Sequence, residues 1–322
     1  MILTFPGPPQ PAAARPTAEA IAGSLWVDVL DPTPDDCLMV EKALGLRIPT
    51  RAQLEEIEIS SRLRIDGDTL YMSAPLVGQS AEGIMSTAAT GFVVAREICL
   101  TVRYARIGAF EAARGRLAQR PPASSVEVFT ALLEEVVDRA ADRLERAAQE
   151  ISEAAQVIYA DPPPGGRKLS RETERLRRAM LQVGRATDRL SQVRYVFVSV
   201  DRMAAFAADR CPHMTPEVHA RLDGVRKDIA SLDEFETSLT SRVQLLHDAA
   251  SGFIAIEQNE VVKILTIVSV VGVPPVLVAG IYGMNFKIMP ELGWSLGYPY
   301  ALLLIVLSTL APLAWFKFRG WL

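Results

Sequence analysis

The chain ends in two stretches that contain no charged side chain, residues 264–286 and residues 292–316. A helix needs about 20 mostly apolar residues to cross the hydrocarbon core of a bilayer, and each stretch is long enough. The pattern therefore predicts a transmembrane hairpin, with one span over residues 263–286 and the second over residues 298–318. Residues 287–297 between them form a short external loop.

The residues before this hairpin have the pattern of a soluble α/β domain. Alternating apolar and polar residues predict a strand over residues 25–30, and two further β-like runs cover residues 69–77 and 91–102. Thr33 and Thr50 each precede a helical pattern, and threonine is a favoured helix N-cap. These elements favour a mixed fold rather than an all-helical one.

The α/β domain is predicted to span residues 23–122, with its last helix starting at about Ile107. Residues 1–22 are rich in Pro and Ala, show no apolar periodicity and are expected to form a flexible leader. They also lack the apolar core of a signal peptide. The soluble part is therefore expected to stay in the cytoplasm.

Long helical patterns follow. Residues 123–210 are predicted to form an antiparallel helical hairpin, in which the first helix is acidic and the second is basic. Charge runs of this kind are most often solvent-exposed helix faces. The sparse aromatic residues beside the basic run argue against a nucleic-acid partner.

Residues 211–262 are predicted to form a stalk helix that continues into the first span. Its apolar residues recur every 3, 4 or 7 positions, as in helices that pack in coiled coils: Leu222, Val225, Ile229, Leu232, Leu239, Val243 and Leu246. A helix that runs from about Pro216 into the membrane is longer than the core of one chain is expected to cover. The pattern therefore favours a homo-oligomer.

The charges beside the spans predict their orientation. Lys263 precedes the first span, and Lys317 and Arg319 follow the second, as the positive-inside rule requires for cytoplasmic flanks. Both termini, including the tail at residues 319–322, are therefore expected in the cytoplasm of a multi-pass plasma (inner) membrane protein.

Small and polar side chains mark one face of the first span. They recur every three or four residues, the spacing of one side of a helix: Asn259, Val262, Thr266, Ser269, Val273, Val276 and Gly280. In one interpretation this face lines an ion pathway inside a ring of subunits. In the other, the Thr and Ser hydroxyls bond back to their own helix and the small residues aid packing.

The pentapeptide Tyr282-Gly283-Met284-Asn285-Phe286 ends the first uncharged stretch. It is accompanied by Glu257-Gln258-Asn259-Glu260, Pro274-Pro275, Met289-Pro290-Glu291-Leu292 and Gly297-Tyr298-Pro299. Together these segments resemble the C-terminal half of the CorA magnesium transporter family. Weaker similarity, as at Trp26-Val27-Asp28, extends the resemblance over nearly the whole chain.

The resemblance implies an α+β membrane protein assembled as a homopentameric funnel. Each subunit would have an N-terminal cytoplasmic α/β domain, a long helical stalk and two C-terminal transmembrane helices, of which the first lines the pore. The residues that carry over are the selectivity filter Gly283, Met284 and Asn285, the inner polar ring Asn259, and the hydrophobic constriction Val262, Leu265 and Val273.

A neutral asparagine ring suits Mg²⁺, which dehydrates reluctantly and demands octahedral oxygen geometry. Amide oxygens can accept hydrogen bonds from the waters around the ion and still release it, as conduction requires. Inward movement of a divalent ion gains about 4.6 kcal/mol at 100 mV. The implied function is Mg²⁺ uptake down the electrochemical gradient, with Co²⁺ and Ni²⁺ as further ions. Mg²⁺ is both substrate and regulatory ligand, and no other cofactor is implied.

The resemblance also implies closure by intracellular Mg²⁺ bound between subunits. The carboxylates in the matching regions are Glu82 in the α/β domain and Asp223 and Asp228 on the stalk, although an ordinary surface role explains each of them too. The external loop departs from the family pattern. Lys287 stands where relatives often have an acidic residue, and Glu291 remains as the main group that attracts cations.

Two other functions fit parts of the pattern. A Zn²⁺ transporter of the same superfamily, with or without proton coupling, would share the fold, but such relatives commonly depart from the Gly-Met-Asn motif. A membrane-anchored coiled-coil scaffold would need no polar face. An enzyme is disfavoured, since the three His residues are scattered. Cys37, Cys99 and Cys211 are isolated, which favours reduced thiols over disulfides or a zinc site.

Overall fold

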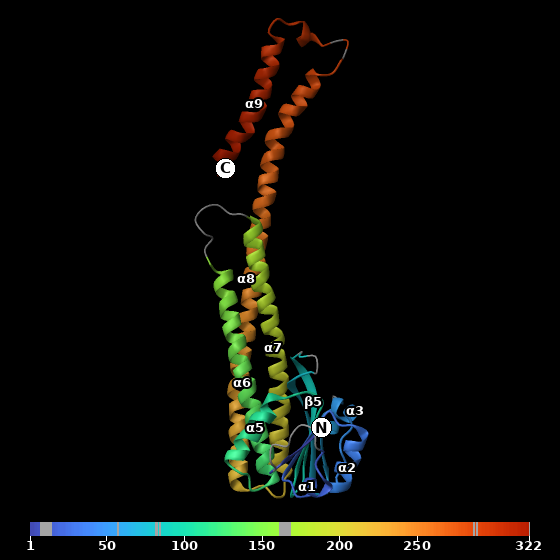
Figure 1. Ribbon diagram of the computed structural model, residues 1–322. Helices are drawn as coiled ribbons and strands as arrows, with labels where there is room; N and C mark the ends of the chain where they lie inside the picture. The colour runs from blue at the N-terminus through green and yellow to red at the C-terminus, as the bar shows by residue number, and fades with distance from the viewer. Residues whose placement is uncertain are drawn as a thin grey trace. The chain divides into compact units, whose positions relative to one another are not determined.

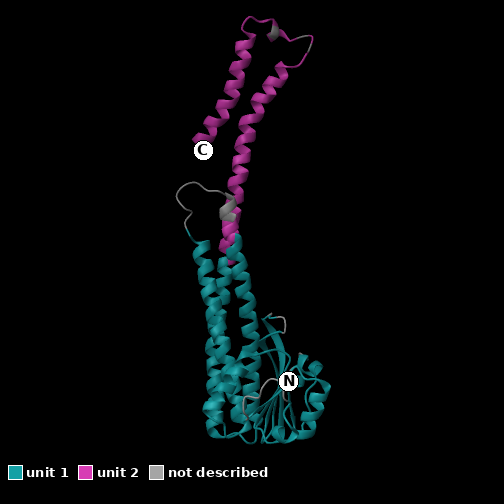
Figure 2. Cartoon of the chain, in the orientation of Figure 1, with its two compact units in different colours: residues 1–160, 177–246 teal, residues 161–176, 247–322 magenta. Residues whose placement is uncertain are grey.

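The computed structural model describes residues 1–322 except 7–14, 57, 81–82, 84, 161–168, 286, 288 and 322, and it describes only the backbone of residues 59, 169–173 and 292. The chain divides into two compact units (Figure 2). Unit 1 contains residues 1–160 and 177–246, and unit 2 contains residues 161–176 and 247–322. Two long helices, α7 (Leu169–Arg210) and α8 (Pro216–Tyr282), contribute residues to both units.

Unit 1 contains a six-stranded sheet (Figure 1). Its strands are β1 (Ile2–Phe5), β2 (Trp26–Leu30), β3 (Leu63–Asp66), β4 (Thr69–Gln79), β5 (Met85–Val94) and β6 (Cys99–Arg103). In space their order is β1-β2-β6-β5-β4-β3. Strands β2 and β6 are parallel, and every other neighbouring pair is antiparallel.

The β-like run at residues 91–102 is not one strand. It comprises the end of β5 and the start of β6, with a bend at Arg96 and Glu97 between them. Apolar residues flank the bend on both sides, so hydrophobicity alone does not mark it. The two strands then pair with each other in antiparallel register.

The prediction of a flexible leader at residues 1–22 is wrong for both of its ends. Residues 2–5 form the edge strand β1, which pairs with β2 and buries Ile2 and Phe5. Residues 18–22 form helix α1 (Ala18–Ala22), capped by the Thr17 hydroxyl and anchored by the buried Ile21. These elements are too short for a periodic signal, and their stability comes from contacts with distant residues. Residues 7–14 lie outside the described part of the chain.

The remaining helices of unit 1 surround the sheet: α2 (Pro34–Leu44), α3 (Arg51–Glu55), α4 (Ile59–Arg62), α5 (Gly108–Gln119) and α6 (Ser125–Ile158). Side chains of the central strands alternate between two buried faces. Val27 and Val29 of β2 belong to a core with Val40 of α2 and Leu54 of α3.

The other face of the sheet packs against α5 and α6 through aromatic rings. Trp26 and Phe92 meet Phe110 of α5, with ring centroids 6.2 and 5.9 Å apart, and Phe92 also meets Phe129 of α6 at 5.8 Å. All three contacts are edge-on, a favoured arrangement for aromatic pairs. This face therefore fixes α5 and α6 against the sheet.

A buried ion pair lies in the same layer. The Arg103 guanidinium of β6 donates to both carboxylate oxygens of Asp28 on β2, with its Nη2 at 2.8 Å from Oδ2. Asp28 also accepts from the Thr101 hydroxyl at 2.9 Å, which in turn accepts from the indole N–H of Trp26. Both charged side chains are at most 2% exposed. The pair joins the two parallel strands.

The predicted N-cap at Thr33 is confirmed. Its hydroxyl accepts from the Asp36 N–H, and the Asp36 carboxylate accepts from the Thr33 N–H, which together form a capping box. Burial alone would raise the pKa of Asp36, but the hydrogen bonds with Thr33 and the positive charges of the N-terminus and Arg15 hold that pKa below its ordinary value. Thr50 forms the same motif with Gln53 at the start of α3.

Helices α6, α7 and α8 pack together in unit 1, and this packing overturns one inference from the sequence. Six of the seven apolar residues predicted for the stalk stripe are already buried within the single chain, with Leu222 fully buried and Val225, Ile229, Leu239 and Leu246 at most 5% exposed, whereas Leu232 is half-buried. Ion pairs flank them, such as Arg221 of α8 with Glu134 of α6 at 2.8 Å. This apolar stripe therefore gives no argument for an oligomer.

Unit 2 contains the C-terminal part of α8, a short 3-10 helix η1 (Pro290–Gly293) and helix α9 (Gly297–Phe318). Within this unit α9 lies beside α8 and runs in the opposite direction (Figure 1). Helix α8 ends at Tyr282, so the first predicted span closes just before the Gly-Met-Asn motif.

Candidate functional site

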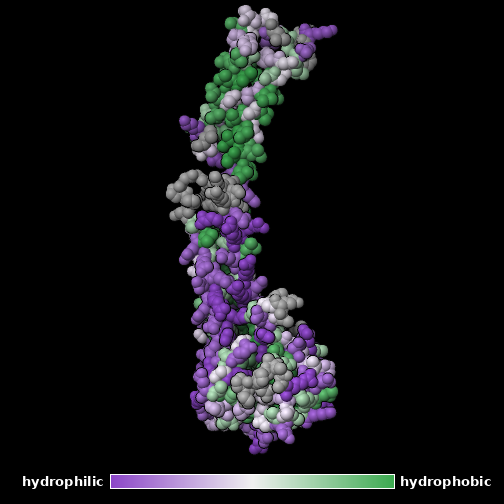
Figure 3. Space-filling model, in the orientation of Figure 1, coloured by the Kyte–Doolittle hydropathy of each residue, from purple (hydrophilic) through white to green (hydrophobic). Residues whose placement is uncertain are grey.

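Both α8 and α9 contain a stretch long and apolar enough to cross a membrane. The stretch in α8 has no buried residue, and Val268, Val276 and Leu277 are 63, 72 and 61% exposed. Figure 3 shows hydrophobic residues, drawn in green, along most of α8 and α9 in unit 2. An apolar surface of this extent requires lipid or other protein as its neighbour.

The surface of α8 in unit 2 has two faces. The half-buried residues recur every three or four positions, at Lys263, Thr266, Ile267, Val271, Pro274, Pro275, Val278 and Tyr282. The ammonium of Lys263 lies 5.7 Å from the ring centroid of Trp321, just beyond α9. The half-buried face is therefore the one turned toward α9.

The opposite face is exposed and contains the residues for which the sequence predicted a pore. Asn259, Val262, Leu265, Ser269, Val273, Val276 and Gly280 are all exposed. Apart from its chain neighbours and the backbone of its own helix, nothing in the described chain lies within 4 Å of the position that a Cβ at Gly280 would take. The exposed face thus combines small, polar and apolar side chains that the described residues leave uncovered.

Thr266 differs from the other residues predicted to line the pore. It is half-buried, and its hydroxyl donates to the Val262 carbonyl at 2.8 Å. This is the back-bonded arrangement that the sequence left open as an alternative for hydroxyl residues in the span. Thr266 therefore lies at the edge of the exposed face, with its polar group satisfied by its own helix.

The Gly-Met-Asn motif follows directly after the end of α8. The Gly283 N–H donates to the carbonyls of Ala279 at 2.9 Å and Gly280 at 3.2 Å, and the Met284 N–H donates to Ile281 at 3.2 Å. The last turn thus tightens toward 3-10 geometry, as helix ends often do. A Cβ at Gly283 would lie 3.2 Å from the Ala279 carbonyl oxygen, a tight contact. Asn285 follows directly and is exposed.

The two charged residues of the predicted external loop, Lys287 and Glu291, differ in their exposure to solvent. Lys287 is exposed, whereas Glu291 is half-buried within η1. Trp294 then packs edge-on against Tyr300 of α9, with ring centroids 6.0 Å apart. The loop is therefore held to the start of α9 by aromatic contact.

Two of the three predicted regulatory carboxylates, Asp223 and Asp228, belong to the described part of the chain. Glu82 lies outside the described residues. Asp223 of α8 is 3.4 Å from the Nδ1 atom of His219, one helical turn away, and Asp228 is exposed. Among the described residues, no group of three or more His, Cys, Asp or Glu side chains is arranged to hold a metal ion.

Sequence reasoning did not single out three arginines on α6. Arg139, Arg143 and Arg146 are spaced by four and three residues, which places them on one side of the helix, and all three line a cavity. The spacing was visible in the sequence. A charge run of this kind predicts a solvent-exposed helix face, because nothing in the local sequence shows what lies opposite.

Comparison with known proteins identifies the family of the chain. The family model described as CorA-like Mg²⁺ transporter protein matches residues 22–319. The magnesium transport protein CorA of Escherichia coli (strain K12) is 31% identical over 315 residues, which cover 95% of this chain and 94% of that protein. The corresponding protein of Pasteurella multocida (strain Pm70) is 32% identical over 308 residues, with the same coverage.

A solved structure shares the fold. The CorA magnesium transporter from Methanocaldococcus jannaschii matches with a TM-score of 0.72 at 19% identity, covering 92% of this chain and 91% of its own. The common fold consists of an N-terminal α/β domain, a long helix and two C-terminal apolar helices. On the family match and the extent of identity with its relatives, the chain belongs to the CorA-like Mg²⁺ transporter family, whose members are transporters and not enzymes.

Proposed function

We propose that this protein is a channel-type transporter that mediates Mg²⁺ uptake down its electrochemical gradient across the plasma (inner) membrane. The observation that carries the proposal is the exposed face of α8, which ends at the exposed Asn285. Relatives that are named as magnesium transport proteins support Mg²⁺ as the ion and do not favour the Zn²⁺ alternative. Co²⁺ and Ni²⁺ are proposed as further ions.

Two spans cannot enclose a pore, so the proposal requires a ring of subunits. We propose the homopentamer that the family resemblance implies, with the exposed face of α8 turned inward and α9 in an outer ring. The half-buried residues of α8 turn toward α9, which leaves the opposite face available for a pore. Both termini would lie in the cytoplasm, where Lys263 and Lys317 flank the spans.

In this ring, Asn285 forms the external filter together with Gly283 and Met284. Gly283 suits this position because the tightened last turn leaves little room for a Cβ beside the Ala279 carbonyl. Five neutral amide groups would accept hydrogen bonds from the waters around Mg²⁺ without holding the ion too strongly. The half-buried Glu291 is proposed to attract cations to the mouth.

The inner part of the pore is proposed to contain the Asn259 ring and a constriction formed by Val262, Leu265 and Val273. These residues are exposed on the same side of α8. A ring of apolar side chains can close a pore by expelling water. Intracellular Mg²⁺ bound between subunits, with Asp223 or Asp228 on the stalk, would favour this closed state.

Ion flux through the purified full chain in liposomes tests the function. With low Mg²⁺ inside, an inside-negative potential is expected to drive Mg²⁺ entry, because each divalent ion gains about 4.6 kcal/mol per 100 mV. Raising the Mg²⁺ concentration inside is expected to slow entry. The proposal is overturned if no Mg²⁺ enters at any internal concentration, or if only Zn²⁺ enters and follows a proton gradient.

A further inference from the structure

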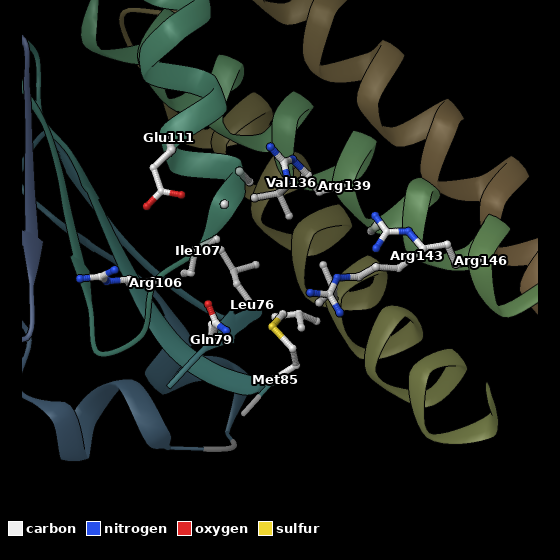
Figure 4. Close-up of a pocket in the computed structure, with 15 residues that line it drawn as sticks. Leu76, Gln79, Met85, Arg106, Ile107, Glu111, Val136, Arg139, Arg143 and Arg146 are labelled. Carbon is white, nitrogen blue, oxygen red and sulfur yellow. The ribbon is translucent and has the colours of Figure 1, made fainter. Parts of the chain in front are cut away.

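Unit 1 contains a cavity of about 490 Å³ between the sheet and helices α5, α6 and α7 (Figure 4). Its walls come from the end of β4, the first turn of α5 and one side of α6, with Val196 of α7. Small-molecule sites typically have volumes of roughly 300–1,000 Å³. The cavity is therefore large enough for a ligand of nucleotide size.

The polar lining of this cavity is strongly basic. Four arginines line it, Arg106, Arg139, Arg143 and Arg146, against one carboxylate, Glu111. The formal charge of these five groups is 4 − 1 = +3. Figure 4 shows Arg139, Arg143 and Arg146 extending from α6. Guanidinium groups gathered in this way match a ligand with several negative charges.

These arginines have no carboxylate partner in the described part of the chain. None of the four has an Asp or Glu oxygen within 4.0 Å there, whereas the neighbouring Arg189 is paired with Glu150. Burial lowers the pKa of the Arg143 guanidinium, and the positive charges of Arg146, Arg189 and Arg139 lower it further. Within the described residues these like charges are thus held together without a neutralising carboxylate, and a bound anion would relieve their repulsion.

The rest of the cavity has two further properties. Apolar side chains, among them Leu76, Ile107, Val136 and Val196, form part of its wall. The first turn of α5 also faces it, and its N-cap residue Ile107 provides no side-chain hydrogen bond. The free N–H groups of a helix start favour a phosphate oxygen. The cavity therefore offers both polar groups for phosphates and an apolar wall for the rest of a ligand.

We infer that this cavity binds a small molecule that carries several phosphate groups and a flat aromatic ring, with a nucleoside triphosphate as the representative of that class. The arginines of α6 would bind the phosphates in bidentate pairs, and the apolar wall would contact the ring. The inference is independent of the proposed ion pathway, because every residue that lines the cavity belongs to unit 1.

Calorimetric titration of the full chain in detergent with ATP, in the presence of EDTA, tests the inference. ATP is expected to bind, and the Arg143→Ala and Arg139→Ala variants are each expected to weaken binding about tenfold or more, as for lost charge-assisted hydrogen bonds. Arg143→Lys keeps the charge but not the bidentate geometry, and is expected to bind with intermediate affinity. Inorganic triphosphate and adenosine are each expected to bind more weakly than ATP.

The matched control is Arg185→Ala, which removes one exposed arginine of α7 that does not line the cavity. It is expected to bind ATP like the unmodified protein, and circular dichroism checks that every variant is folded. Absence of ATP binding, or an equal loss of affinity in Arg185→Ala, would overturn the inferred site. Loss of subunit association in Arg143→Ala without any ATP binding would also overturn it, and would assign the arginines to a contact between subunits.

Discussion

Replacing Asn285 with alanine is expected to reduce Mg²⁺ flux in liposomes at least about tenfold. The proposed filter holds the hydrated ion through hydrogen bonds from its waters to a ring of amide oxygens, and each hydrogen bond between neutral groups contributes about 0.5–1.5 kcal/mol. Alanine removes the acceptor from every subunit at once. The ion would then meet a ring of methyl groups at the end of α8, where nothing replaces its lost partners.

The matched control is Ser295→Ala, which removes an exposed polar group from the connection between α8 and α9. This variant is expected to keep its flux within about twofold, because Ser295 lies outside the exposed face of α8 and surface substitutions usually have small effects. Cross-linking of both variants checks that each still assembles. Undiminished Mg²⁺ flux in Asn285→Ala would remove Asn285 from the proposed filter.

Replacing Asp28 with alanine is expected to destabilise unit 1 by about 3–5 kcal/mol, the usual cost of removing one partner from a buried ion pair. In the unmodified protein the Arg103 side chain is only 2% exposed. The variant therefore leaves its guanidinium buried without a carboxylate partner. The Thr101 hydroxyl loses its acceptor as well. Because the pair joins the inner strands β2 and β6 and Arg103 lies over the Phe110 ring of α5, the loss is expected to affect the packing of α5 as well.

Hydrogen exchange of the full chain in detergent measures this effect, with protection of the β2 and β6 amides as the readout. Asp201→Ala is the control, because Asp201 pairs with Arg226 at 2.9 Å but both side chains are about 40% exposed. Exposed pairs contribute about 0–1 kcal/mol. Equal losses of protection in the two variants would show that the buried pair has no special role in the sheet.

The features that sequence predicted well are those that depend on neighbouring residues. The cap at Thr33 forms because its hydroxyl and the Asp36 carboxylate are three residues apart, a local relation that any fold would keep. The apolar stretches of the spans are likewise local. The Gly-Met-Asn motif at residues 283–285 led to the correct family, which the comparisons then established along most of the chain.

The features that sequence missed depend on residues that are distant in the chain. Strand β1 is stable only because Val29 and its neighbours provide a pairing edge. The apolar residues of the stalk, such as Leu222, are covered by α6 and α7, which no periodicity in α8 could show. The basic cavity requires α5 and α6 to meet, so its arginines looked like ordinary surface charges.

The central proposal, a pore lined by the exposed face of α8, is tested most directly by cysteine substitution on its two faces. Ser269→Cys and Val276→Cys lie on the exposed face, and Ile267→Cys and Val278→Cys lie on the half-buried face toward α9. A charged, membrane-impermeant thiol reagent is applied to liposomes during Mg²⁺ flux, with the unmodified protein as the control for its native cysteines. The proposed pore predicts that the reagent blocks flux at positions 269 and 276 and has no effect at 267 and 278. Block confined to positions 267 and 278 would contradict it.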